Sequence, residues 1–357
     1  IKDQDLIVAT HGRSFWILDD LSPLHQLSKD TTSKACFLFK PRTTFRTTKI
    51  LGEIAAERIG PGKNYWVALG IPATFLENQQ TDPRINRTFL DSGETTPNGI
   101  IFKYYVKEKH PVDPVITIYK SDQSVIAKFS GIKKDGKSKI PNEVGINHFI
   151  WNLRYQGPKP APEDKANKLI AGPSPDGPLV VPGNYSIKLE ISNETLIQDF
   201  EIKQDPKSEA SQQDLENQLE LLLKIRDSIT ATNETVNQLR STRTKFLSYI
   251  DEQSDLETDP VLILSLKEIV SNLNGLEDRL ISTWNTSERG QMGTPLPKLV
   301  EALATLISVV ESADAAPTKN SYAVFEHLSS QIETLLKDYK KIVNSKSMST
   351  LDLNKSN

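Results

Sequence analysis

The feature that most constrains the fold of this chain is a change in the spacing of its apolar residues near residue 206. Up to that point, apolar and polar residues alternate over short runs separated by Pro and Gly, a pattern typical of β-strands and turns. Beyond it, apolar residues recur at steps of three and four, the period of an amphipathic α-helix. The sequence therefore predicts a multidomain protein with a β part followed by an α part, divided at 205/206.

Residues 206–345 are predicted to form an antiparallel helical bundle, or a long helical hairpin with two shorter helices packed on it. The first helix would be about 60 Å long at 1.5 Å per residue. Pro260 and Pro295 stand where a helix starts, after Asp and Thr. Because the connections are short, sequential helices should lie antiparallel. The expected helices cover about 211–251, 260–284, 295–312 and 318–345, and the polar residues 346–357 are expected to form a disordered tail.

Residues 36–205 are predicted to form an antiparallel Ig-like or fibronectin-like β-sandwich with a surface insertion. A Pro-, Lys- and Gly-rich stretch, 157–178, is expected to be a long surface loop. The fold of residues 52–98 stays open, with a polar insertion at 78–94 placed on the outside. The predicted strands are 100–106, 115–119, 125–129, 145–153, 185–191 and 196–202.

Two further strands are predicted at the start of the chain, Leu6–Thr10 and Phe15–Leu18, joined by a turn. A two-stranded hairpin buries too little apolar surface to be stable alone. The chain also begins with Ile rather than Met. We therefore expect the chain to be the C-terminal part of a larger protein whose preceding part holds the main functional domain.

The stretch Leu6–Asp20, LIVATHGRSFWILDD, resembles the last blade of bacterial sortilin-like β-propeller proteins with BNR (Asp-box) repeats, which are often labelled glycosyl hydrolases. Asn147–Tyr155 and Pro182–Leu189 resemble the Ig-like sandwich of these proteins, and Ile225–Asp227 and Val309–Thr318 resemble their C-terminal helices. The resemblance implies that residues 1–35 are last-blade strands of a truncated propeller plus a linker.

The resemblance also implies a function: a non-catalytic accessory or structural region of an exported propeller protein, supporting glycan or protein binding in the periplasm or outside the cell. The alternative is an accessory part of a glycoside hydrolase whose catalytic acids lie in the upstream propeller. This chain contains no complete Asp-box, so no catalytic residue of the family can be assigned to it. Self-association through the helices is a third possibility.

Four residues are candidates for ligand binding. His11 and Arg13 lie in the hairpin turn, where Arg13 could bind a carboxylate on the propeller face. The other interpretation is that His11 shapes the turn and Arg13 pairs with an acid on a neighbouring blade. Trp151 and Tyr155 could stack on sugar rings, but a large aromatic such as Trp151 is also typical of a sandwich core.

Asp19 and Asp20 could form a carboxylate pair for glycoside chemistry. Adjacent strand residues point to opposite faces, however, which favours a solvated Asp and a turn cap instead. Cys36 is the single cysteine, so no intrachain disulfide can form. We expect it to be a small buried hydrophobe, because no motif places a His beside it.

Composition excludes several classes of ligand. The 43 Lys and Arg against 46 Asp and Glu are mixed along the chain, which does not predict the basic face that nucleic acid requires. No apolar run approaches the roughly 18 residues of a membrane span. His residues are scattered, and no Gly-rich phosphate loop is present, so neither a metal nor a cofactor is predicted. The expected partners are the upstream propeller and a glycan or peptide ligand.

Overall fold

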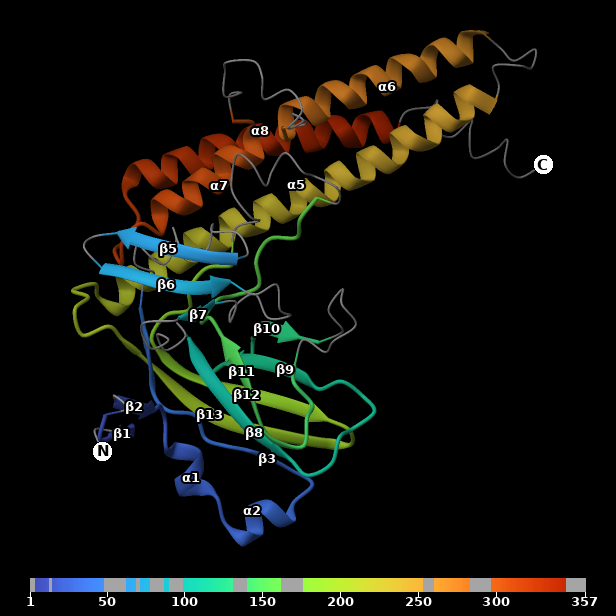
Figure 1. Cartoon of the computed structure of the whole chain (residues 1–357). Helices are drawn as coiled ribbons and strands as arrows, with labels where there is room; N and C mark the ends of the chain where they lie inside the picture. The colour runs from blue at the N-terminus through green and yellow to red at the C-terminus, as the bar shows by residue number, and fades with distance from the viewer. Residues whose placement is uncertain are drawn as a thin grey trace. The chain divides into compact units, whose positions relative to one another are not determined.

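The structure is a computed structural model that describes residues 4–12, 15–47, 62–68, 71–77, 87–89, 99–130, 140–161, 176–252, 260–282 and 297–344, with the backbone alone at 62–68, 71–77 and 87–89. The chain divides into two compact units. We call residues 1–156 with 179–209 the β unit, and residues 157–178 with 210–357 the helical unit (Figure 1). The predicted order of β part before α part is confirmed.

Two sheets of the β unit contribute side chains to one core. A five-stranded sheet has the order β10-β9-β12-β13-β4, and a three-stranded sheet has the order β11-β8-β3. Their strand pairs are antiparallel except for β13 with β4, which is parallel. The strands are β3 Cys36–Leu38, β4 Thr44–Arg46, β8 Ile100–Val106, β9 Val115–Lys120, β10 Val125–Phe129, β11 Gly145–Trp151, β12 Gly183–Ile191 and β13 Glu194–Gln204.

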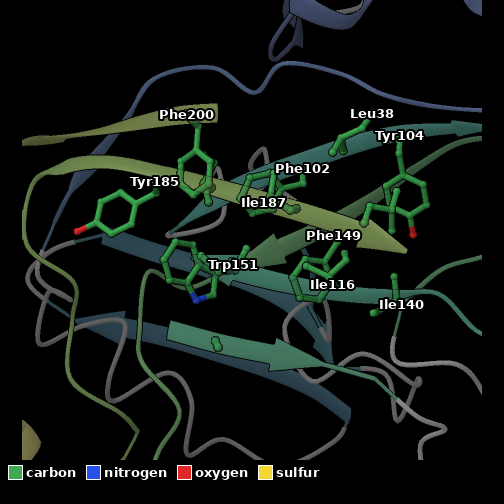
Figure 2. Packing of buried hydrophobic residues seen from close by; sticks show 14 of the residues in the cluster. Leu38, Phe102, Tyr104, Ile116, Ile140, Phe149, Trp151, Tyr185, Ile187 and Phe200 are labelled. Atoms are coloured by element: carbon green, nitrogen blue, oxygen red, sulfur yellow. The ribbon is translucent and has the colours of Figure 1, made fainter. Parts of the chain in front are cut away.

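The core between these sheets follows from strict alternation along the strands. In β8 and β12 every second side chain is buried and the residues between them are half-buried or exposed. Figure 2 shows the resulting cluster around Trp151, whose ring centroid lies 6.4 Å from Tyr185 and 6.2 Å from Phe200. The Trp151 indole N–H donates to the Arg154 carbonyl at 2.9 Å, so its polar atom is satisfied within the core.

The region whose fold the sequence leaves open contains a third sheet. It has the order β5-β6-β7, with β5 Gly62–Ala68, β6 Ile71–Glu77 and β7 Arg87–Phe89. Strand β7 falls inside the stretch 78–94 that the sequence analysis places as a polar insertion. The rest of that stretch lies outside the described residues.

The opening hairpin forms as predicted. Strands β1 Leu6–Ala9 and β2 Phe15–Leu18 pair antiparallel into a sheet of their own. The expected linker after them contains two short helices, α1 Ser22–Gln26 and α2 Lys29–Ser33. The hydroxyl of Ser28 caps α2 by accepting the Thr31 N–H at 3.1 Å.

Helices occupy the four stretches in which they are predicted. They are α5 Gln212–Glu252, α6 Pro260–Leu280, α7 Leu299–Val310 and α8 Lys319–Val343. Side chains from all four helices form one buried cluster, which includes Leu222, Leu273, Leu303 and Leu335. The described part of α6 and α7 is shorter than predicted, and the connection 283–296 and the tail 346–357 lie outside the described residues.

Residues 157–178, predicted as a surface loop of the β part, belong to the helical unit. In the described portion, Ala161 is buried in the helical core. The Asn233 side chain of α5 donates to the Lys159 carbonyl at 2.8 Å, and the Lys159 ammonium lies 2.5 Å from the Glu234 carboxylate. Pro-rich composition predicts the lack of regular structure but not the helix against which the segment packs.

Buried polar side chains join the helices at specific points. Glu277 of α6 pairs with Arg240 and Arg243 of α5, and only 3% of the Glu277 side chain is exposed. Gln218 of α5 donates to the carbonyls of Val310 and Ala313, both at 2.7 Å. These carbonyls lie at the C-terminal end of α7, where the backbone lacks helical partners.

Candidate functional site

The most unusual surface of the β unit is the opening hairpin. Its large apolar side chains are mostly solvent-exposed, up to 73% for Phe15 and 65% for Trp16. Exposed apolar patches of this kind are typical of interaction surfaces. We call this surface the hairpin patch, and its members are Ile7, Val8, Phe15, Trp16, Ile17 and Leu18.

The hairpin patch covers both faces of the two-stranded sheet. Val8 lies opposite Trp16, so these two side chains share one face. Ile7 lies opposite Ile17 and therefore shares the other face with it. All four are exposed by more than two fifths, at 43%, 65%, 47% and 61%. Both faces of the hairpin thus have apolar surface available for a partner, whereas a solvated antiparallel sheet usually presents one polar face.

The base of the hairpin is held by hydrogen bonds and ion pairs. The Asp20 carboxylate lies 2.9 Å from the Lys103 ammonium of β8, and its other oxygen accepts the Ser22 N–H at 3.2 Å. Asp5, just before β1, accepts the Asp20 N–H at 3.0 Å and pairs with Arg42 at 2.8 Å. These contacts connect both ends of the hairpin to the rest of the β unit.

Asp20 therefore acts locally, and it does not form a carboxylate pair with its neighbour. Asp19 is exposed, while Asp20 caps the turn that precedes α1. Burial acts to raise the pKa of Asp20, but hydrogen bonds from Ser22 and Lys103 and the Lys103 charge outweigh it, so this pKa lies below its usual value.

The predicted binding residues that the structure describes differ in their exposure to solvent. His11 is exposed in the hairpin loop, and Arg13 lies outside the described residues. Trp151 is fully buried, which excludes stacking on a sugar and agrees with the core interpretation. Tyr155 is half-buried and packs against the same core. None of the described candidates is part of the hairpin patch.

Cys36 has a His neighbour that the sequence analysis does not anticipate. His110 Nε2 lies 3.4 Å from the Cys36 sulfur, and 74 residues separate the two in sequence, so no local motif could show the pair. Cys36 is 2% exposed. Burial, together with the negative charge of Glu194, raises the pKa of its thiol. Both the burial of this thiol and its raised pKa disfavour the thiolate, which supports a structural role for Cys36.

A polar hollow of about 480 Å³ lies beside the five-stranded sheet. Its polar lining from β12 and β13 is Asn184, Ser186, Asp199 and Glu201, and its remaining border is formed by Lys40, Pro41, Thr43, Ser121 and Gln123. Its two aromatic residues, Tyr185 and Phe200, are both 4% exposed, so their rings are not available for stacking. Amide, hydroxyl and carboxylate groups in such a hollow can hydrogen-bond a polar ligand, and its volume falls within the usual range for small-ligand sites.

Within the described ranges, no group of three or more His, Cys, Asp or Glu residues is placed to hold a metal ion. None of the helices that the structure describes combines the length and the apolar character needed to cross a bilayer.

Comparisons with known proteins identify no relative of this chain: no family model, curated protein or solved structure matches it. The hairpin patch and the polar hollow are therefore the two features of the described chain from which a function can be argued.

Proposed function

We propose that this chain is the non-catalytic C-terminal accessory region of an exported sortilin-like β-propeller protein. In this proposal the hairpin supplies the last-blade strands of the propeller, the two sheets with a shared core form an Ig-like sandwich, and the four long helices form an antiparallel bundle. The observation that carries the proposal is the hairpin patch, with exposed apolar side chains on both faces of a sheet that has two strands in the described part of the chain.

The two-faced patch supports a blade more than a simple docking surface. A sheet that is covered on both faces carries apolar residues on both, while a sheet with one solvated face alternates apolar and polar residues. Blades of a propeller are sheets arranged in a ring around a central channel, so each blade packs against a neighbour on either face. Among the described residues, β1 and β2 form a sheet of two strands, and a propeller blade has four.

Binding of glycan or protein is the second element of the proposal, and the polar hollow supports it. Asp199 and Glu201 supply acceptors for hydroxyl groups, and the Asn184 amide supplies both donors and acceptors. A saccharide presents hydroxyl groups in several directions, which such a set of side chains can match. Export to the periplasm or the cell exterior belongs to the proposal by family resemblance.

Docking of the hairpin is tested by expressing this chain and the segment encoded directly upstream of it as two separate polypeptides. Mixing them should form a complex, and emission from Trp16 should shift to the blue as its indole leaves water. The Trp16→Phe variant isolates that signal from the other tryptophans.

The Ile17→Asp variant should abolish the complex, because it places a charge in a buried layer. The control Ile197→Asp changes an equally exposed apolar residue of β13 outside the patch, and it should leave binding unchanged. An upstream segment that lacks Asp-box repeats, or a complex insensitive to Ile17→Asp, would contradict the proposal.

Glycan binding is tested by calorimetric titration with a panel of neutral and acidic oligosaccharides. The double variant Asp199→Ala, Glu201→Ala should abolish any binding observed, whereas Glu190→Ala, on the same strand face but outside the hollow, should preserve it. Binding that survives loss of both carboxylates would place the glycan site elsewhere.

A further inference from the structure

We infer that Asp20, through its ion pair with Lys103, is a positioning residue that holds the hairpin in a fixed direction on the β unit. One consequence, that the hairpin docks in a prearranged orientation, rests on the proposed function. The holding contacts themselves are properties of this chain alone.

Each polar group of Asp20 has a partner. Its N–H donates to Asp5 at 3.0 Å, and its carbonyl accepts from the Lys103 ammonium at 3.3 Å. One carboxylate oxygen accepts the Ser22 N–H at 3.2 Å, and the other lies 2.9 Å from the Lys103 ammonium. Only 12% of the Asp20 side chain and 20% of the Lys103 side chain are exposed. Such a pair is shielded from solvent and is therefore stronger than a typical surface ion pair.

The backbone of Asp20 is in the left-handed region, with φ of 62°. A non-glycine residue adopts this conformation at a cost, and Asp and Asn tolerate it best. The conformation turns the chain sharply between the exposed strand β2 and the helix α1. The ion pair with Lys103 and the hydrogen bond from Ser22 offset this cost. Asp20 thus has both the strained backbone and the side chain that stabilises it.

A second set of contacts holds the residues just before β1, where the chain enters the hairpin. The Leu21 N–H donates to the Gln4 carbonyl at 2.6 Å, which joins the entry and exit of the hairpin. Asp5 then connects that junction to Arg42 at 2.8 Å. Lys103 is itself fixed in β8, between the buried residues Phe102 and Tyr104. Lys103 therefore connects the hairpin base to the three-stranded sheet.

Fixing the hairpin before it meets a partner lowers the entropy lost on docking. Without the Asp20–Lys103 pair, the hairpin would keep its own strand pairing and its apolar surface, but its direction would vary. Docking should then weaken although no residue of the hairpin patch has changed. This outcome separates a positioning role from a contact role.

The test uses the full chain with Asp20→Asn, Lys103→Met and the double variant. Asn tolerates the left-handed conformation and keeps an acceptor for Ser22, so the substitution removes chiefly the charge. Asp19→Asn is the matched control, because it removes the same charge from the exposed neighbour. The readouts are amide exchange of residues 18–21, the free energy of unfolding and the dissociation constant for the upstream segment.

Both single variants should accelerate exchange at the hairpin base and raise the dissociation constant by about tenfold, which corresponds to 1.4 kcal/mol. The double variant should add little to either single one, because the two residues act through one contact. Both single variants should also lower the free energy of unfolding, because each leaves one partner of a shielded pair without the other. The Asp19→Asn control should stay near the parent values in all three readouts.

Unchanged exchange in Asp20→Asn would overturn the inference, and so would accelerated exchange with unchanged affinity. If the parent chain forms no complex with the upstream segment, the proposed function fails, while exchange at the hairpin base still decides whether Asp20 holds the hairpin.

Discussion

Glu277 of α6 accepts a hydrogen bond from Nε of Arg240 in α5 at 2.7 Å, with only 3% of the Glu277 side chain exposed. Its second carboxylate oxygen binds Arg243, which also donates to Asn274 at 2.8 Å. One buried carboxylate thus joins two arginines of α5 to α6, and breaking such a pair from one side leaves charge without its partner.

Removing this carboxylate should destabilise the helices. Glu277→Ala leaves two guanidinium groups without their shared partner, and we expect a loss of about 3 kcal/mol, the lower end of the range for breaking a buried ion pair, because both arginines are partly exposed. Urea unfolding followed by helical circular dichroism measures it. Glu268→Ala, exposed on the same helix, should change stability by less than about 0.5 kcal/mol.

Truncation of Trp151 and of Trp16 should change the stability of the chain by very different amounts. Trp151→Ala opens a cavity in the core of the β unit and should cost about 3–5 kcal/mol. Trp16→Ala, 65% exposed, should change the stability of this chain by less than about 0.5 kcal/mol. Thermal unfolding compares them directly. Equal destabilisation by the two substitutions would mean that the hairpin packs against this chain rather than standing exposed.

The end of α7 should depend on a side chain from another helix. Gln218→Ala removes the donor to the Val310 and Ala313 carbonyls and leaves the buried Val310 carbonyl without it, at a cost of about 1–3 kcal/mol. Amide exchange in residues 307–313 should accelerate more than exchange in α8. Gln213→Ala, exposed on α5, is the control and should alter neither region.

The hairpin base should loosen in acid. The pKa of Asp20 is lowered in the folded chain, so its ion pair stabilises the base above the ordinary Asp pKa of about 3.9 and this contribution is lost as the pH falls through the lowered value. Exchange at residues 18–21, corrected for the intrinsic effect of pH, should rise below about pH 4. In Asp20→Asn this rise should be absent. A rise of equal size in that variant would assign it to another carboxylate, with Asp5 the nearest candidate.

Local patterns predict much of the secondary structure. The bounds of β8 and β10 and the start of α6 match the sequence analysis, because alternation, turns and a helix-starting Pro are written in neighbouring residues. The three-residue strands β3 and β4 were not assigned individually, since so short a run carries no clear period. Strand β4 pairs with β13 across more than 150 residues of sequence, and only the tertiary fold brings the two together.

The candidate site divides in the same way. The hairpin and its apolar composition can be predicted from Leu6–Leu18 alone, and the burial of Trp151 is one of the two interpretations that the sequence analysis offers. The role of Lys103 could not be predicted, because it is one of many lysines and lies 83 residues from Asp20. The His110 neighbour of Cys36 and the polar hollow also combine residues that no local motif connects.

Local sequence patterns predict most of the long strands and the four long helices, because hydrophobic period, caps and turn residues act over a few neighbouring positions. The fold in three dimensions is needed to learn which polar side chains meet, that the described part of 157–178 packs in the helical unit, and that both apolar faces of the hairpin are exposed. Burial and ion pairing depend on contacts between residues distant in sequence. One strand or helix pattern is compatible with many such contacts, so the local pattern does not select among them.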